Sequence, residues 1–270
     1  MSILSLFSHS LAKESFVFFD VETTGLFPLA GDRVVEIAMI KCEKGSVSGT
    51  FEMMFNPGIP MPQEASAVNK ITDEMLADKP LFDVEIGKQI IDFIGSSILI
   101  AHNSAFDLGF LSFELASVGL IFRDWKSIDT LRMAQKLYPG QKNKLESLMR
   151  RYNMLPEGDL HRALVDTDSL RKVFFEMLNE TEIRNKTLEQ LIKDYGFQGI
   201  NFHKFIPAKV REAMVDREII QAKYKKRNGE IVNMSVLPIA PVWSGRKWFL
   251  IAQDEKTGMK ISLNGNSFIF

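Results

Sequence analysis

The hydrophobic positions of the chain follow one pattern near the start and another further along. Short apolar runs rich in β-branched and aromatic residues come first, at 16–20, 33–41 and 49–55, with turn residues between the last two. They predict three strands in an antiparallel meander. The run at 16–20 is apolar on both faces, which indicates a strand in the interior of a sheet.

After the meander, apolar residues recur at helical spacing, and short strand-like runs separate these segments. A loop with three prolines, 56–62, comes first. Strands followed by alternating strands and helices predict an α/β fold, in which helices cover a mixed sheet. The predicted strands are 97–101 and 127–129, and the predicted helices are 72–77, 84–94, 107–118, a segment ending at 138, 144–152 and a last one opening at 161–168.

The pattern changes again near residue 181. It predicts a helix over 181–195, a connector over 196–207, and then short strands with an Asn228-Gly229 turn signal. Short strands at close spacing favour a small antiparallel barrel. The predicted strands are 219–224, 231–237, 247–252 and 260–263, and the predicted units are an α/β domain (1–180), a helical connector (181–215) and the barrel (216–270).

Charge is distributed unevenly between the two parts of the chain. The net charge of −1 over 270 residues combines 18 Lys+Arg against 25 Asp+Glu in residues 1–180 with 15 against 9 in residues 181–270. The first part is therefore at −7 and the second at +6. The basic part either faces an anionic partner or neutralises the acidic part across an interface, and the sequence leaves both readings open.

The cysteine content and the N-terminus bear on the cellular compartment. A single cysteine, Cys42, excludes an internal disulfide and a cysteine-based zinc cluster, and it fits a reducing compartment. Residues 1–13 lack the basic segment of a signal peptide, and no apolar run approaches the roughly 20 residues that span a bilayer. We therefore expect a cytoplasmic protein with no membrane partner.

Four acidic residues lie at the ends of elements that are predicted to be buried. Asp20 and Glu22 are two apart in an extended segment and so face the same side, although alone they would suit a solvated turn. Asp107 begins the apolar side of one helix, and Asp166 lies on the apolar stripe of another. Buried carboxylates need a cation or a proton, and an oxygen-only ligand set favours Mg²⁺ or Mn²⁺.

Such a site suits hydrolysis of a phosphodiester. Two ions held about 4 Å apart can activate a water and stabilise the leaving oxygen. His161, five residues before Asp166, can take the proton of that water, although a structural role for this histidine is the alternative.

The order and spacing of these residues resemble the three motifs of the DEDDh 3′→5′ exonuclease family. The segments are Asp20-x-Glu-Thr-Thr-Gly25, His102-Asn-x-x-Phe-Asp107 and His161-x-Ala-x-x-Asp166. The family includes the proofreading subunit of bacterial replicative polymerase and ribonuclease T, and the resemblance covers roughly residues 13–180. It implies a ribonuclease H-like fold.

The resemblance also implies roles for individual residues. Asp20, Glu22 and Asp166 would hold one metal ion, Asp20 would bridge to a second ion that Asp107 reaches, and His161 would be the general base. Thr23, Leu26, Asn103 and Phe106 would contact the 3′-terminal nucleotide, with ordinary core positions as the alternative for Leu26 and Phe106 and a role in shaping the loop as the alternative for Asn103. His102 is expected to shape the loop rather than to bind metal. One departure is Asn69-Lys-Ile-Thr72, where relatives often carry His-Gly-Ile-Thr.

The C-terminal segments resemble a WYL domain. They are Ile220–Tyr224, Asn228-Gly-Glu, Val236-Leu-Pro238 and Lys247–Ala252, in which the name-giving Trp-Tyr-Leu reads Trp248-Phe-Leu250. The resemblance implies a small Sm-like barrel that senses nucleic acid or nucleotides. The arginines that relatives place on the later strand are missing, so a structural or protein-contact role stays open.

The leading hypothesis is a metal-dependent exonuclease that releases 5′-mononucleotides from the 3′ end of DNA or RNA. The alternative is a non-catalytic nucleic-acid-binding protein or polymerase-associated adaptor on an exonuclease fold. The basic C-terminal unit is a candidate contact for a polymerase or another protein. Many relatives dimerise, so a homodimer is also an open alternative.

Overall fold

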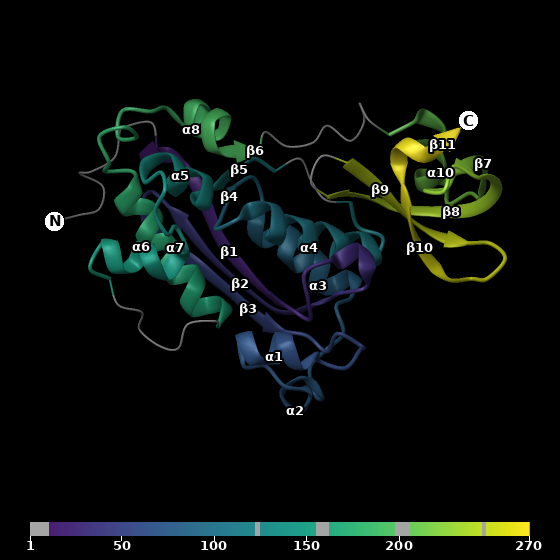
Figure 1. The fold of residues 1–270 in the computed structure, drawn as a ribbon, viewed down its shortest axis with the longest axis horizontal. Helices are drawn as coiled ribbons and strands as arrows, with labels where there is room; N and C mark the ends of the chain where they lie inside the picture. Colours follow the sequence, from purple (N-terminus) through teal and green to yellow (C-terminus); the bar gives the residue numbers. More distant parts are fainter. Residues whose placement is uncertain (1–10, 122–124, 155–161, 198–205, 245–246, 270) are drawn as a thin grey trace.

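A computed structural model gives two sheets with helices around them (Figure 1). The larger sheet belongs to the first 197 residues and the smaller one to the C-terminal part. No helix among the described residues is long and apolar enough to cross a membrane. The described residues are 11–121, 125–154, 162–197, 206–244 and 247–269.

The larger sheet is mixed, as predicted, and has the strand order β3-β2-β1-β4-β5-β6. The first three strands form the predicted antiparallel meander, whereas β4 and β5 run parallel to β1. The short strand β6 pairs antiparallel with β5 and was not predicted. The strands are β1 (Ser15–Thr23), β2 (Val34–Glu43), β3 (Ser46–Met54), β4 (Ile98–Ala101), β5 (Ser127–Asp129) and β6 (Gly196–Phe197).

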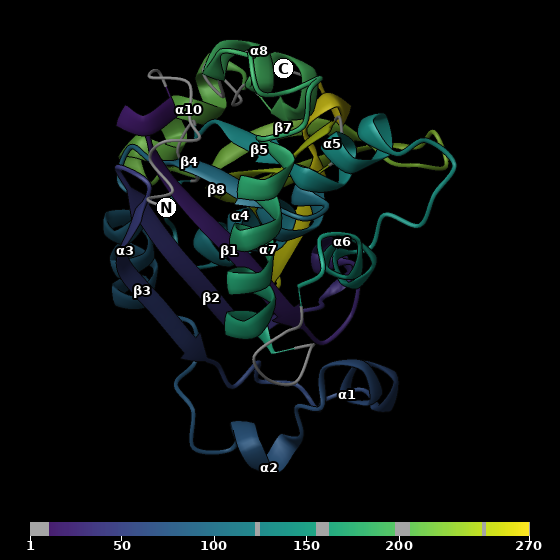
Figure 2. The ribbon, with the colours of Figure 1, turned by 90° about the vertical axis from the view of Figure 1, so that its left-hand side faces the viewer.

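Strand β1 lies inside the sheet because both of its faces are apolar. Phe16 and Phe18 pack into the core on one side, and Val17 and Phe19 pack into the core on the other. Helices α3 (Val84–Ile94) and α4 (Ser104–Ser117) cover the second face. The first face is covered by α5 (Thr130–Leu137), α6 (Leu145–Arg151), α7 (Ala163–Met177) and α8 (Leu188–Tyr195), as Figure 2 shows from the side.

Two short helices, α1 (Gln63–Asn69) and α2 (Asp73–Leu76), lie beyond the end of the sheet. They enclose a small core of their own with Val35 and Met61. Helix α1 was not predicted because it buries only its last residue, Asn69, so its sequence carries no apolar period.

Helix α8 is shorter than the sequence predicted. Residues 181–185 form turns, and the helix starts after Thr187, whose side chain accepts a hydrogen bond from the Gln190 backbone N–H. The Gln190 side chain accepts a bond from the Thr187 N–H in return, which completes a capping box. The predicted start at 181 is therefore wrong, and the Thr-x-x-Gln signal marks the true one.

The C-terminal part forms a five-stranded antiparallel sheet with the strand order β10-β9-β8-β7-β11. Strand β8 continues past Pro238 with an irregular register, so it is longer than predicted. The antiparallel strands are as expected, but the predicted Sm-like closure is not shown among the described residues. The elements are α10 (Ala208–Asp216), β7 (Ile220–Lys225), β8 (Ile231–Ser244), β9 (Lys247–Asp254), β10 (Lys260–Asn264) and β11 (Phe268–Ile269).

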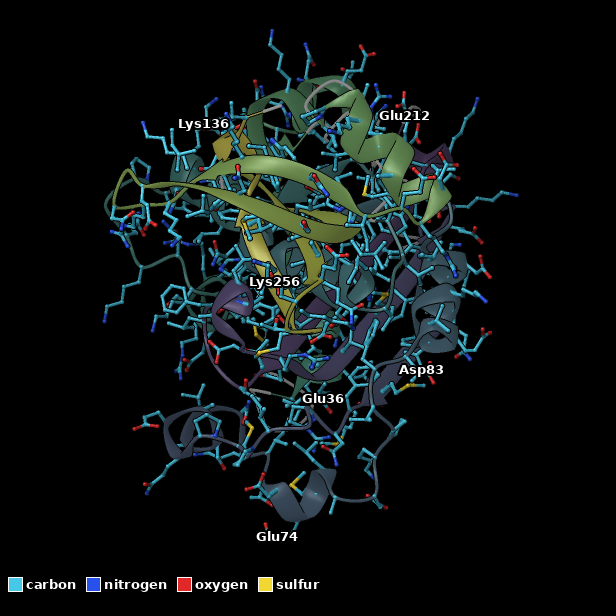
Figure 3. All side chains as sticks on the ribbon, turned by 90° about the vertical axis from the view of Figure 1, so that its right-hand side faces the viewer. Glu36, Glu74, Asp83, Lys136, Glu212 and Lys256 are labelled. Carbon is cyan, nitrogen blue, oxygen red and sulfur yellow. The ribbon has the colours of Figure 1, made fainter. Side chains whose placement is uncertain are left out.

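The C-terminal sheet packs on α4, the helix that also covers the larger sheet. Ala116 of α4 lies in one apolar cluster with Ala240, Val242 and Ile251 of the C-terminal sheet. The Lys260 Nζ donates a hydrogen bond of 2.6 Å to the Ser117 carbonyl at the end of α4. Figure 3 looks at the molecule from the side of this sheet, which lies in front.

A buried ion pair ties α4 to the start of β2. The Arg33 guanidinium donates to both carboxylate oxygens of Glu114, at 2.8 and 2.7 Å, and the Val34 N–H donates to the same carboxylate at 3.1 Å. Glu114 is 1% exposed, so these donors replace the water that would otherwise solvate its carboxylate. The pair therefore fixes the position of α4 against the sheet.

We expect Arg33→Ala to lower the free energy of unfolding at neutral pH by about 3 kcal/mol, because it leaves the Glu114 carboxylate buried without its partner. Chemical denaturation measures this. Lys88→Ala is the matched control, since Lys88 pairs with Glu85 on the surface and such pairs contribute less than about 1 kcal/mol. Equal effects of the two substitutions would contradict this account.

Candidate metal centre

Three carboxylates from two elements meet at the end of β1. Asp20 and Glu22 come from the strand, and Asp166 comes from the first turn of α7. One oxygen of each lies within 4.8 Å of an oxygen of the other two. The structure thus brings together three of the four acids that the sequence singled out.

Asp107 lies in the first turn of α4, on the opposite face of the sheet from α7. It is 3% exposed, and its Oδ1 accepts a hydrogen bond of 3.3 Å from the Val21 N–H, between Asp20 and Glu22 in β1. Asp107 is outside the group of three, but its charge acts directly on Asp20. The fourth acid therefore borders the same cluster.

The cluster concentrates negative charge on three side chains that are only partly exposed to water. Burial, and then the charges of Asp107 and Glu22, raise the pKa of Asp20 well above its usual range. Burial and Asp166 raise the pKa of Glu22 to about 8, and burial also raises the pKa of Asp107. A divalent cation would relieve this repulsion, and the oxygen-only donor set fits Mg²⁺ or Mn²⁺.

A salt bridge next to the cluster holds the start of α7. Glu36 faces Glu22 across the β1–β2 pairing, an arrangement of like charges that needs compensation. Glu36 is fully buried; its carboxylate accepts hydrogen bonds from Arg162, at 2.8 Å, and from the Ala163 N–H, at 3.1 Å. Glu36 thereby fixes the helix turn that carries Asp166.

Sequence reasoning missed this role of Glu36. The signal was present, because Glu36 is a charged residue within an apolar strand segment. Its partner Arg162 is 126 positions away, and no local pattern connects the two residues.

Asn69, in the segment that departs from the family pattern, contacts the site. It is buried, and its Nδ2 donates to the Thr23 carbonyl at 3.3 Å. A hydrogen bond from Asn69 also lowers the pKa of Glu22, against the larger effect of burial. The next residue, Lys70, has a left-handed backbone with φ of 61°, which a glycine adopts more easily.

The loop after β1 forms an exposed apolar rim beside the cluster. Leu26 is 67% exposed and Phe27 is 66% exposed, so Leu26 is not a core residue. The Asp32 carboxylate accepts a hydrogen bond of 2.9 Å from the Phe27 N–H and fixes the loop. Thr23 is buried at its base and donates to the Gly25 carbonyl at 2.6 Å. Phe27 was not among the predicted substrate contacts.

The N-cap and first turn of α4 carry the other predicted contacts. Phe106 is partly buried, with its ring centroid 4.9 Å from that of Phe110. Asn103 has a left-handed backbone, and its N–H donates to the Asp129 Oδ1 at 3.0 Å. The Nδ1 of His102 lies 2.9 Å from the Thr130 Oγ1, and burial lowers the pKa of His102. His161, the predicted general base, lies outside the described residues.

Comparison with known proteins identifies the class to which this fold and acidic cluster belong. The sequence profile of a family described as "Exonuclease" matches residues 17–174, more than half of the chain. The chain belongs to this exonuclease family, as the three motifs predicted. The resemblance of the C-terminal part to a WYL domain is not shown.

Two relatives illustrate the match. The DNA polymerase III subunit epsilon of Rickettsia conorii is 36% identical over 180 residues, which cover 64% of this chain and 78% of that protein. The PolC-type DNA polymerase III of Bacillus cereus is 33% identical over 198 residues, which cover 73% of this chain and 14% of that protein. The chain thus spans only a small part of the PolC-type polymerases that it matches.

Solved structures share the fold. Exonuclease X in complex with 5′-overhanging duplex DNA is 27% identical, with a TM-score of 0.52, and covers 66% of this chain and 98% of its own. The nuclease domain of 3′hExo, a DEDDh family member bound to rAMP, is 19% identical, with a TM-score of 0.56. The match covers 67% of this chain and 100% of that domain. Exonuclease I of E. coli in complex with a dA16 oligonucleotide is 15% identical, with a TM-score of 0.54. The match covers 89% of this chain and 55% of that protein.

We expect the melting temperature of the metal-free protein to fall as pH rises from 5 to 8. Glu22 has a folded-state pKa of about 8 and an unfolded-state value of about 4.3, so the folded state binds its proton more tightly over this range. Stability is therefore lost as that proton leaves. Thermal denaturation in EDTA measures this.

Glu22→Gln removes this titration. At pH 8 the metal-free variant should melt several degrees above the wild type, and added Mg²⁺ should raise its melting temperature less. If the melting temperatures of the wild type and the variant depend on pH in the same way, the raised pKa assigned to Glu22 is contradicted.

Proposed function

We propose that the chain is a 3′→5′ exonuclease that uses two Mg²⁺ or Mn²⁺ ions to release 5′-mononucleotides. The observation that carries this proposal is the convergence of three half-buried carboxylates, Asp20, Glu22 and Asp166, with the buried Asp107 beside them. Family membership and the ribonuclease H-like arrangement of sheet and helices support it. DNA is the proposed first substrate, because the relatives quoted above are named as DNA polymerase components.

In this proposal the carboxylates bind metal and His161 takes the proton. Asp20, Glu22 and Asp166 would hold one ion, and Asp20 and Asp107 would hold the other. Bound ions would supply charge stabilisation at the reacting phosphate and lower the pKa of a water. His161 is two residues before the start of α7 and five before Asp166 in sequence, which supports its role as general base.

The 3′-terminal nucleotide would lie against the loop after β1. Leu26 and Phe27 offer two exposed apolar side chains there, and base stacking on such side chains tolerates any sequence. The other side of that nucleotide would be contacted by Phe106, Thr23 and Asn103. Stacking explains how an exonuclease degrades strands of any sequence.

The role of the second unit and the choice of partner are part of the proposal. We divide the chain at residues 180 and 215, and we assign nucleic acid with a free 3′ end as the ligand. A polymerase contact is proposed because one relative is named as a DNA polymerase III subunit. A non-catalytic adaptor is the second candidate, but its function would not require three clustered acids with a fourth beside them.

We expect Asp20→Asn to lower the rate of release of 5′-mononucleotides by roughly three orders of magnitude, since the metal ions contribute several kcal/mol and each 1.4 kcal/mol is tenfold. The assay compares matched 3′-labelled DNA and RNA strands with Mg²⁺ and with Mn²⁺. Asp92→Asn, an exposed change on α3, is the control and should be active.

A wild-type protein that degrades neither strand with either ion would refute the enzyme proposal and favour the adaptor. An active Asp20→Asn variant would refute the metal site. The relative rates on DNA and RNA identify the preferred sugar.

A further inference from the structure

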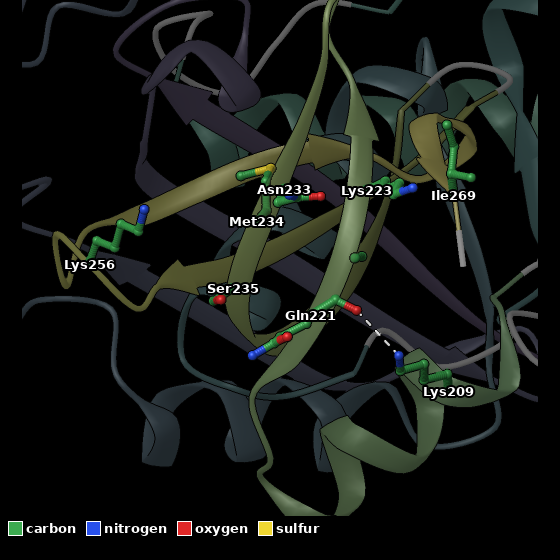
Figure 4. Close-up of a pocket in the computed structure, with 9 residues that line it drawn as sticks. Lys209, Gln221, Lys223, Asn233, Met234, Ser235, Lys256 and Ile269 are labelled. Atoms are coloured by element: carbon green, nitrogen blue, oxygen red, sulfur yellow. Dashed lines mark hydrogen bonds between the residues drawn. The ribbon is translucent and has the colours of Figure 1, made fainter.

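A groove runs over the outer side of the C-terminal sheet. Its volume is about 560 Å³, and Lys209, Lys223 and Lys256 line it. Figure 4 shows Gln221 and Lys223 of β7 beside Asn233 and Ser235 of β8, with Lys209 and Lys256 on opposite sides. The groove lies apart from the carboxylate cluster, and nothing in the proposed mechanism uses it.

Sheet geometry explains why these residues share one face. In the β7–β8 pairing Gln221 lies opposite Ser235 and Lys223 opposite Asn233, and residues two apart in a strand point the same way. The alternate residues Ile220 and Ala222 are buried instead. The outer face of this hairpin therefore presents polar and cationic groups, while its inner face packs into the core.

The groove is suited to an anion. Its lining contains three lysines, two amides and a hydroxyl but no carboxylate. Lys223 and Lys256 are both exposed, and the charge of Lys256 also acts on the nearby Asp254 carboxylate. Lys209 donates to the Gln221 carbonyl at 3.2 Å, which places its ammonium at the groove edge.

The acidic part of the molecule gives a reason for such a groove. Residues 1–180 carry a net charge of −7 and contain the half-buried carboxylate cluster, so they repel a polyanion. A basic surface attached to the same body would raise the local concentration of an anionic strand. The net charge of +6 over residues 181–270 supplies it.

The groove-bearing sheet is joined to the substrate side of the larger sheet. Leu29, three residues after the exposed Leu26, packs in one cluster with Ala240 and Val242 of β8. The loop that carries the exposed Leu26 and Phe27 therefore lies against the C-terminal sheet.

We propose that this groove binds the phosphate backbone of the nucleic-acid substrate upstream of its 3′ end. The proposal rests on the proposed exonuclease function for the identity of the strand. The lysines contact phosphates, and Gln221, Asn233 and Ser235 donate hydrogen bonds to the same backbone. The occupant is a single nucleic-acid strand, chosen over an acidic protein because the loop that packs on the same sheet through Leu29 carries the apolar Leu26 and Phe27, which suit bases.

The test compares Lys223→Glu/Lys256→Glu with Lys44→Glu/Lys88→Glu. The second pair changes two exposed lysines of the larger unit and matches the change in net charge. Binding of a fluorescent 20-nucleotide single strand is measured in EDTA, which prevents hydrolysis. We expect the groove variant to bind the strand at least about tenfold more weakly than the control variant. The slope of log K against log[salt] should also be smaller in magnitude by about 1.4, the value for two lost phosphate contacts on a single strand.

A second measurement separates this proposal from the exonuclease function. Hydrolysis of a nitrophenyl ester of a 5′-mononucleotide, which is too short to reach the groove, should be unchanged in both double variants. If the groove variant binds the 20-nucleotide strand as tightly as the control, the groove proposal is overturned even if the ester is cleaved. If no variant cleaves the ester, the exonuclease proposal fails, and the binding result still decides the groove.

Polyglutamate of the same charge is the third probe. It should bind more weakly than the nucleic-acid strand, and its binding should differ little between the two variants. Equal affinity for polyglutamate, lost in the groove variant, would assign the groove to an acidic protein and overturn the proposal.

Discussion

Repulsion among closely spaced, half-buried carboxylates is the constraint on which the rest of the structure depends. Asp20 and Glu22 lie on one face at the end of a central strand, and helices on both sides of the sheet add Asp166 and Asp107. Burial and mutual charge raise the pKa values of Asp20, Glu22 and Asp107. The fold therefore holds these carboxylates together at a cost in stability. A divalent cation bound between them would remove that cost.

The scaffold resists this repulsion through two ion pairs that fix the helices carrying Asp166 and Asp107. Glu36 and Arg162 hold the start of α7, and Glu114 and Arg33 hold α4 against β2. Both pairs involve a buried glutamate that also accepts a backbone N–H, from Ala163 or Val34. The two helices that deliver the outer carboxylates are thus fixed to the same central strands. The C-terminal sheet adds a third support, since it packs on the far part of α4.

The sequence was most informative where periodicity and burial act locally. The two-residue period of β1 placed Asp20 and Glu22 together, and the helical stripe with Leu170 placed Asp166 on the buried side. It could not show the partner of Glu36, which is fixed only by tertiary packing. Likewise, the sequence left Leu26 between core and rim, and only its exposure in the folded chain decides this. His161, outside the described residues, stays a prediction.

A titration of bound Mn²⁺ by electron paramagnetic resonance, with a 5′-mononucleotide present, tests the central claim most directly. The account predicts two ions per wild-type chain, because four carboxylates are available to share them. Asp107→Asn should retain no more than one, and Asp20→Asn should lose both sites at the same metal concentration. A wild-type chain that binds no Mn²⁺, or an Asp20→Asn variant that still binds two ions, would contradict it.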